Sequence, residues 1–182
     1  MRTGKASFEY ILRVFVLAFA GLLLVAPAIA AGDHVLAEID GKKLTRKDFD
    51  AYLALFKGNA RYNPTTLEGK KRMLQHFIDR TLLLQAAKKE GYEKLDVLKK
   101  HPFVDRVEEE TIILRAYLQD HVSKKVAVSP EEIAAYKKAH PGMKTEKVKE
   151  LLAARQQKIL FDKLMKRLRA EHTIRVYPEN LD

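Results

Sequence analysis

The regular pattern of the chain begins with a short run of alternating apolar residues, followed by a turn. Residues 35–39 (VLAEI) have the period of a β-strand, and residues 42–44 return as a second strand. Asp40-Gly41 between them is a strong hairpin turn signal. A two-stranded hairpin is marginally stable in water by itself. The pattern therefore predicts a hairpin that needs a third strand, or a helix, from elsewhere in the chain.

Helical periodicity follows the hairpin, with recognisable signals at the helix ends. Thr45 is a helix cap, and Asp48 three residues later completes a capping-box pattern. A second helix begins after Thr65 or Thr66, carries a wide apolar stripe and stops at Gly91. These signals predict two helices in the first half of the chain.

The second half of the chain contains three further helical segments and a final strand. Ser129 caps one helix, with Pro130 in its first position, and the last helix runs from about Thr145 to Ala170. Residues 173–178 (TIRVYP) then form a lone strand. The helix beyond His101-Pro102 carries apolar residues at spacings of three and four, which predicts a seam against another helix. The seam positions are Val104, Val107, Thr111, Leu114 and Leu118. The stripe predicted for the last helix is Val148, Leu151, Leu152, Ile159, Phe161, Leu164, Met165 and Leu168.

These elements indicate a mostly α fold: a helical domain with a small β-sheet. With 182 residues, 47% hydrophobic and 32% charged, the chain can bury one core and keep a heavily charged surface. The 34 Lys and Arg against 24 Asp and Glu give a formal net charge of +10. Bases and acids are interleaved along the helices, as in residues 89–100 (KEGYEKLDVLKK), without the alternating aromatic residues that stack on nucleic acid bases. We interpret the charge as solvated helix faces and expect no nucleic acid partner.

The first thirty residues have the pattern of a secretory signal peptide. A basic start precedes 17 uncharged residues from Val14 to Ala30, which end in Ala-Ile-Ala. The alternative is an uncleaved membrane anchor, because 17 residues is near the shortest length that spans a bilayer. Pro27 and the small residues before Ala31 favour cleavage. We expect residues 1–30 to be removed, leaving residues 31–182 in the periplasm with no stable membrane anchor and a net charge of +8.

Four segments, taken in order, resemble the N-terminal chaperone module of SurA-like and PrsA-like periplasmic folding factors. They are LAEIDGKKLTRKDF (36–49), FIDRTLLLQAAKKEGY (77–92), VSPEEIAAYKK (128–138) and LMKRLRAEHTIRVY (164–177). The resemblance covers nearly all of residues 35–177, and the succession of the segments carries it. It implies a helical module that cradles unfolded outer-membrane or secreted polypeptides. It also implies that the last helix and strand return beside the first segments, so that residues 173–177 (TIRVY) pair with the hairpin.

The resemblance bears on the short stretch His140 to Met143. In many relatives a parvulin-type prolyl isomerase domain is inserted between the helix at 128–138 and the final helix. Here no insertion is present at 140–145, and the chain has no Gly-Gly pair and no second strand-rich region. The resemblance therefore implies that the isomerase domain is missing. From the residues alone, the same stretch is an ordinary helix-Pro-Gly-helix turn.

The sequence has no pattern that indicates catalysis, a cofactor or a metal. There is no Cys, none of the six histidines stands three or four residues from another, and no glycine-rich phosphate loop occurs. Ser123 and Ser129 are not on a nucleophile-elbow pattern. The acidic run Glu108 to Glu110 is interpreted as a solvated helix face.

The prediction that follows is a chaperone that binds unfolded clients in a shallow apolar groove without chemistry. The candidate groove residues are Phe56, Tyr62, Phe103 and Tyr117, each of which also fits the core. Two other functions stay open at this point: a prolyl isomerase, by family label alone, and a structural component of an envelope complex.

Overall fold

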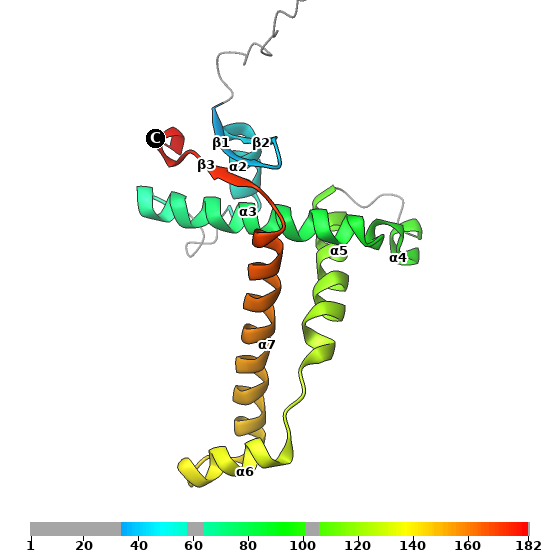
Figure 1. Cartoon of the computed structure of the whole chain (residues 1–182), viewed down its shortest axis with the longest axis vertical. Coiled ribbons are helices and arrows are strands. Elements are labelled where there is room, and N and C mark those ends of the chain that lie inside the picture. Colours follow the sequence, from blue (N-terminus) through cyan, green and yellow to red (C-terminus); the bar gives the residue numbers. More distant parts are fainter. Residues whose placement is uncertain (1–33, 58–63, 101–105, 182) are drawn as a thin grey trace, which may run out of the picture. The chain divides into compact units, whose positions relative to one another are not determined.

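The fold consists of a small sheet and a set of helices (Figure 1). The structure is a computed structural model, and it describes residues 34–57, 64–100 and 106–181. The strands are β1 (Val35–Ile39), β2 (Lys42–Thr45) and β3 (Ile174–Val176). The longer helices are α2 (Arg46–Ala54), α3 (Leu67–Lys89), α5 (Arg106–His121), α6 (Pro130–Ala139) and α7 (Thr145–Ala170). Short helical turns are η2 (Tyr92–Lys94), α4 (Asp96–Lys99), η3 (Ser123–Lys125) and η4 (Pro178–Leu181). The predicted mostly α class is confirmed; the signal-peptide prediction lies outside the described residues.

The sheet has the order β2-β1-β3, and both pairings are antiparallel. The C-terminal strand therefore supplies the partner that the hairpin needs, as predicted. Glu38 in the central strand stands opposite Lys43 on one side and Arg175 on the other. Opposite charges at cross-strand positions favour this register.

The hairpin turn also forms hydrogen bonds with the two residues that precede β3. Asp40 and Gly41 both have positive φ, 49° and 80°, as a tight two-residue hairpin turn requires. The Asp40 N–H donates to the Thr173 carbonyl at 2.9 Å, and Thr173 N–H donates back to Asp40 Oδ1 at 2.7 Å. Asp40 Oδ2 also bonds His172 Nδ1. One carboxylate thus joins the first turn of the domain to its last strand.

The predicted helix caps are confirmed. Thr45 and Ser129 each form a capping box, with Asp48 and Glu132 respectively. Of the two candidates for the start of α3, Thr66 is the cap, since its hydroxyl accepts from the Gly69 N–H. Each cap satisfies an N–H that the first helical turn would otherwise leave unpaired. Local sequence therefore determines where these helices start.

The core lies between the sheet, α2, α3, α5 and the last turns of α7. It is closed by Leu181, which is fully buried and whose carbonyl accepts from Arg46 Nη1 at 2.9 Å and Lys70 Nζ at 3.0 Å. Asn180 Nδ2 also donates to the Val35 carbonyl at 2.8 Å. The largest fully buried side chains are Leu36, Ile39, Phe49, Leu74, Ile78, Leu82, Ile113, Tyr117, Val148, Leu168 and Leu181.

The seam predicted for α5 is correct for Leu114 and Leu118, which are half-buried and pack against the core, and wrong for its N-terminal members. Val107 is 40% exposed and Thr111 is exposed, whereas Ile113 and Tyr117 are fully buried; Val104 lies outside the described residues. Apolar residues occur on two adjacent faces of this helix, so spacings of three and four can be traced along either. The face that bears the large aromatic ring packs on α3 and η2.

The stripe predicted for α7 is correct at Val148 and towards its C-terminal end, and it is wrong at Leu151 and Ile159. Leu164, Met165 and Leu168 are buried, but Leu151 and Ile159 are 36% and 56% exposed. The first half of α7 packs mainly against α6, and α6 has no buried residue of its own. This part of the domain is therefore stabilised by much less apolar burial than the part around the sheet.

Removing residues 173–182 should destabilise the domain strongly. The truncation deletes β3, exposes one edge of β1 and empties the site of Leu181, whose loss alone is comparable to a buried Leu→Ala change of about 2–5 kcal/mol. We expect a loss of at least about 3 kcal/mol in the free energy of unfolding, measured by urea denaturation. A chain lacking only Asp182 is the control, and an unchanged midpoint in the longer truncation would show that β3 contributes nothing.

Asp40→Asn should weaken the domain in a pH-dependent way. Hydrogen bonds with His172 and Thr173 lower the pKa of the Asp40 carboxyl. A lowered folded-state pKa contributes stability that is present above the unfolded value, about 3.9, and is lost as pH falls through the folded value. Asn tolerates the positive φ and retains an acceptor for Thr173. We expect the urea midpoint of the variant to lie below the parent's at pH 7 and to converge with it in acid; a difference independent of pH would contradict this.

Candidate client-binding cavity

A cavity of about 330 Å³ opens between β2, α2, α3 and α5. This is near the lower end of the usual size of protein ligand sites. The capping box at Thr45 positions α2, because it starts that helix directly after β2. The apolar part of the wall is formed by Leu44, Tyr52, Leu55, Phe77, Leu84 and Val107.

Rigid aromatic side chains support this wall. Tyr52 stacks on Phe77 with ring centroids 5.0 Å apart, and Phe56 meets Tyr52 edge-on at 5.2 Å. Two aliphatic side chains of the wall reach solvent: Leu55 is 43% exposed and Val107 is 40% exposed. Apolar surface supported in this way can bind an apolar segment without reorganising first.

Charged side chains border the cavity, and the central ones are tied together. Glu110 accepts from Arg80 Nη2 on α3 and from Arg106 Nε on its own helix, both at 3.1 Å. The Glu110 side chain is only 16% exposed. The interpretation of the acidic run as a solvated face is thus wrong for Glu110, which joins α5 to α3. Sequence alone could not show this, because Arg80 and Glu110 are thirty residues apart.

One hydrogen-bond acceptor in the cavity wall is unused. Gln85 Oε1 is buried and has no hydrogen-bond partner among the described residues. A buried acceptor without a partner is costly to the folded state. In addition, β2 is an edge strand, and Lys42 to Leu44 line the same cavity. An extended polypeptide carries both apolar side chains and N–H donors, which are the groups that this wall can bind.

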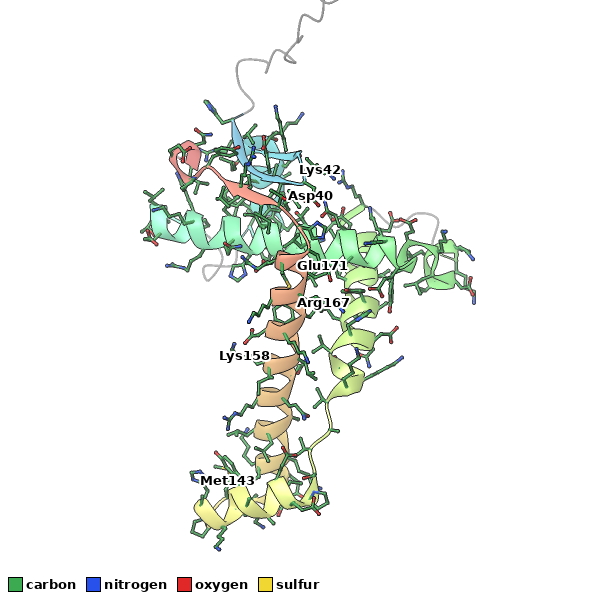
Figure 2. The ribbon with its side chains drawn as sticks, viewed as in Figure 1. Asp40, Lys42, Met143, Lys158, Arg167 and Glu171 are labelled. Carbon is green, nitrogen blue, oxygen red and sulfur yellow. The ribbon has the colours of Figure 1, made fainter. Side chains whose placement is uncertain are left out.

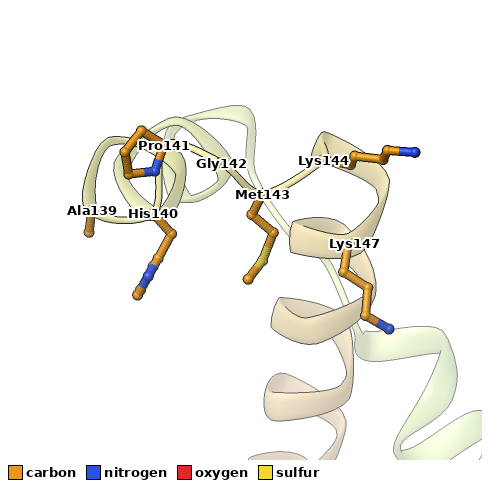
Figure 3. Close-up of a pocket in the computed structure, with 7 residues that line it drawn as sticks. All are labelled: Ala139, His140, Pro141, Gly142, Met143, Lys144 and Lys147. Carbon is orange, nitrogen blue, oxygen red and sulfur yellow. The ribbon is translucent and has the colours of Figure 1, made fainter.

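Two further hollows lie along α7. One of about 310 Å³ lies between α5 and α7 and is lined by Leu118, Val122, Phe161 and neighbouring residues. The other, of about 670 Å³, lies at the turn between α6 and α7, where His140, Met143 and Lys147 extend to the same side (Figure 3). Met143 is the only large apolar side chain of that hollow. The cavity between β2, α2, α3 and α5 therefore has the stronger apolar character.

The structure separates the four groove residues predicted from sequence. Phe56 is half-buried and touches the cavity wall through Tyr52. Tyr117 is fully buried in the core, so it offers no surface to a client in this conformation. Tyr62 and Phe103 lie outside the described residues. The residues that line the cavity were missed because they come from four elements, and only their packing brings them together.

Tyr117 belongs instead to a buried aromatic cluster. Its ring lies 4.2 Å from that of His121 and 5.4 Å from that of Tyr92. Burial raises the pKa of Tyr117, with the nearby Arg167 opposing the rise, although the hydroxyl makes no hydrogen bond of normal geometry with a described residue. Burial, together with the bond to Asp120, raises the pKa of Tyr92 to about 12. Both hydroxyls are therefore neutral at physiological pH, and the cluster has a packing role.

Over the described ranges, no three His, Asp or Glu side chains are grouped so that they could hold a metal ion. In the same ranges, none of the helices has both the length and the apolar character needed to cross a membrane. No protein-family model and no curated protein sequence matches the chain.

Proposed function

We propose that the protein is a periplasmic chaperone that holds unfolded outer-membrane or secreted polypeptides without catalysis. The observation that carries this proposal is the cavity between β2, α2, α3 and α5, where exposed Leu55 and Val107 adjoin the Tyr52–Phe77 stack and the edge strand β2. This combination suits a short extended segment with apolar side chains.

The proposed mechanism is burial of client side chains on a rigid wall. Apolar surface removed from water contributes about 25 cal/mol per Å², so a few client side chains are enough for reversible binding. The edge of β2 can pair with the backbone of an extended client, and the bases at the border of the cavity, Lys42, Lys43 and Lys88, attract acidic segments. Arg80 and Arg106 are held by Glu110, which keeps the wall in place when the cavity is empty.

The architecture supports the proposal through the family resemblance. The resemblance implies a helical module in which the last helix and strand return beside an N-terminal hairpin, and the described fold has that arrangement. It also implies that an isomerase domain is missing between the last two helices, where α6 ends at Ala139 and α7 begins at Thr145. The signal-peptide pattern of residues 1–30 supports a periplasmic location.

Leu55→Ser with Val107→Ser should weaken client holding. Both side chains are partly exposed in the cavity wall, so the change costs little folding stability but removes contacts of about 1 kcal/mol each from the client. We expect roughly thirtyfold weaker suppression of the aggregation of an unfolded outer-membrane protein, since the two contacts together contribute about 2 kcal/mol and about 1.4 kcal/mol corresponds to a factor of ten.

A matched control for this variant is Leu67→Ser with Val97→Ser. Leu67 and Val97 are 42% and 43% exposed, and neither lines the cavity. The control should suppress aggregation as well as the parent. Equal loss in both double variants would mean that general surface hydrophobicity, and not this cavity, holds clients.

The protein should leave the cis-to-trans rate of a prolyl test peptide at its uncatalysed value. Catalysis must lower a barrier of about 18–20 kcal/mol, which requires a shaped and partly dry pocket around the prolyl bond. The hollow at His140 to Met143 is open and has one large apolar side chain. A rate that rises in proportion to protein concentration would favour the isomerase alternative over passive holding.

A further inference from the structure

The positive charge of the protein is concentrated on α6, α7 and the turn between them. Residues 130–170 contain eleven Lys and Arg against five Asp and Glu, a net charge of +6 out of +10 for the whole chain. Six of these bases, all exposed, form no ion pair with a described residue. They are Lys138, Lys144, Lys149, Arg155, Lys163 and Lys166.

Several of these bases share one face of α7. In Figure 2 this helix begins next to Met143 and contains the labelled residues Lys158 and Arg167. Residues three or four apart lie on the same face of a helix. The exposed residues of the face that follows this spacing are called the basic stripe: Lys144, Lys147, Arg155, Lys158 and Lys166, with Leu151 and Ile159 between them. Val148 lies on the same face but is fully buried. Two of its bases are partly neutralised, because Lys147 pairs with Glu150 and Lys158 with Asp162.

The apolar members of the stripe are unusually exposed. Ile159 is 56% exposed, more than any other large apolar side chain in the described ranges, and Leu151 is 36% exposed. Arg155 and Ile159 line none of the three hollows described above, whereas Lys158 borders the hollow between α5 and α7, and Lys144 and Lys147 border the one at the α6–α7 turn. The surface at Arg155 and Ile159 is therefore the outer face of a helix, without a groove that could enclose a peptide.

We infer that the basic stripe docks the protein on an anionic phospholipid surface. From Lys144 to Lys166 the helix is about 33 Å long at 1.5 Å per residue, so its bases can meet several lipid phosphates at once. Isolated aliphatic side chains among bases can enter the boundary between headgroups and acyl chains. An acidic polypeptide would also be attracted by the charge, but a convex face gives its backbone no hydrogen bonds and no enclosure. This inference is independent of client holding in the cavity.

The test is co-sedimentation of the full chain with two kinds of vesicle: phosphatidylcholine alone, and equal parts of phosphatidylcholine and phosphatidylglycerol. The stripe variant combines Lys144→Gln, Arg155→Gln and Lys166→Gln. The control combines Arg72→Gln, Lys89→Gln and Lys94→Gln, which removes two lysines and one arginine that are exposed, lie outside the stripe and form no ion pair with a described residue. Both variants lose the same charge, and all the proteins share residues 1–33. The difference in binding between the two kinds of vesicle, compared between the two variants, therefore measures the contribution of the stripe.

We expect the parent to prefer the anionic vesicles and the stripe variant to bind them about 100-fold more weakly, because each base at an anionic surface contributes about a factor of five. The control should stay close to the parent. A second variant, Lys144→Arg with Lys166→Arg, retains the charge and should bind like the parent. Raising the salt concentration should reduce the parent's preference.

Three results would overturn the inference. One is a parent that binds both vesicles equally, and another is an equal loss in the stripe and control variants, which would reflect net charge alone. The third is a stripe variant that keeps its vesicle binding but loses suppression of aggregation, which would make the stripe a surface for acidic polypeptide clients.

Discussion

The fold depends on β1 having a neighbour on both sides. Leu36 and Ala37 are completely buried and Ile39 is 1% exposed, so this strand is the apolar centre of the sheet. Its first neighbour follows after a two-residue turn, but the second, β3, arrives from the far end of the chain. Closing so long a loop costs conformational entropy, which the buried contacts of the returning segment must exceed. Asp40, Leu181 and Asn180 supply those contacts at both ends of the strand.

The return of β3 also determines how α7 is stabilised. Because α7 leads into β3, its last turns lie on α3, where Leu164, Met165 and Leu168 are buried and Arg169 pairs with Asp79. Burial of Asp79 nevertheless raises the pKa of its carboxyl, so desolvation outweighs the attraction of Arg169. Apolar packing, more than this ion pair, therefore stabilises the junction. The first half of α7 packs mainly against α6, which leaves room for the exposed bases of the stripe.

Local signals in the sequence predicted the fold well. Helix caps, the hairpin turn and the ends of α7 depend on neighbouring residues, so Thr45, Ser129 and Gly41 are informative by themselves. The pairing of β3 with β1 followed only from the family resemblance, because no local signal links the two ends of a chain. The faces of α5 and α7 were predicted less well, since an apolar stripe does not show which neighbour covers it.

Most of the candidate site could not be predicted from the sequence. Four elements contribute to the cavity, and the pairing of Arg80 with Glu110 spans thirty residues. Aromatic residues were good candidates for a groove by type, yet Tyr117 is in the core because its ring fills the space beside His121 and Tyr92. Partial exposure of Leu55 and Val107, which supports the proposed site, is a property of the packed structure.

Site-specific photo-crosslinking to an unfolded outer-membrane protein tests the central claim most directly. A photoreactive amino acid would replace Leu55 in the cavity wall in one protein, and in others Val97 or Ile159, which are exposed outside the cavity. The account predicts client adducts at Leu55 and few at the other two positions. Adducts of equal yield at all three positions, or adducts at Ile159 without any at Leu55, would contradict it.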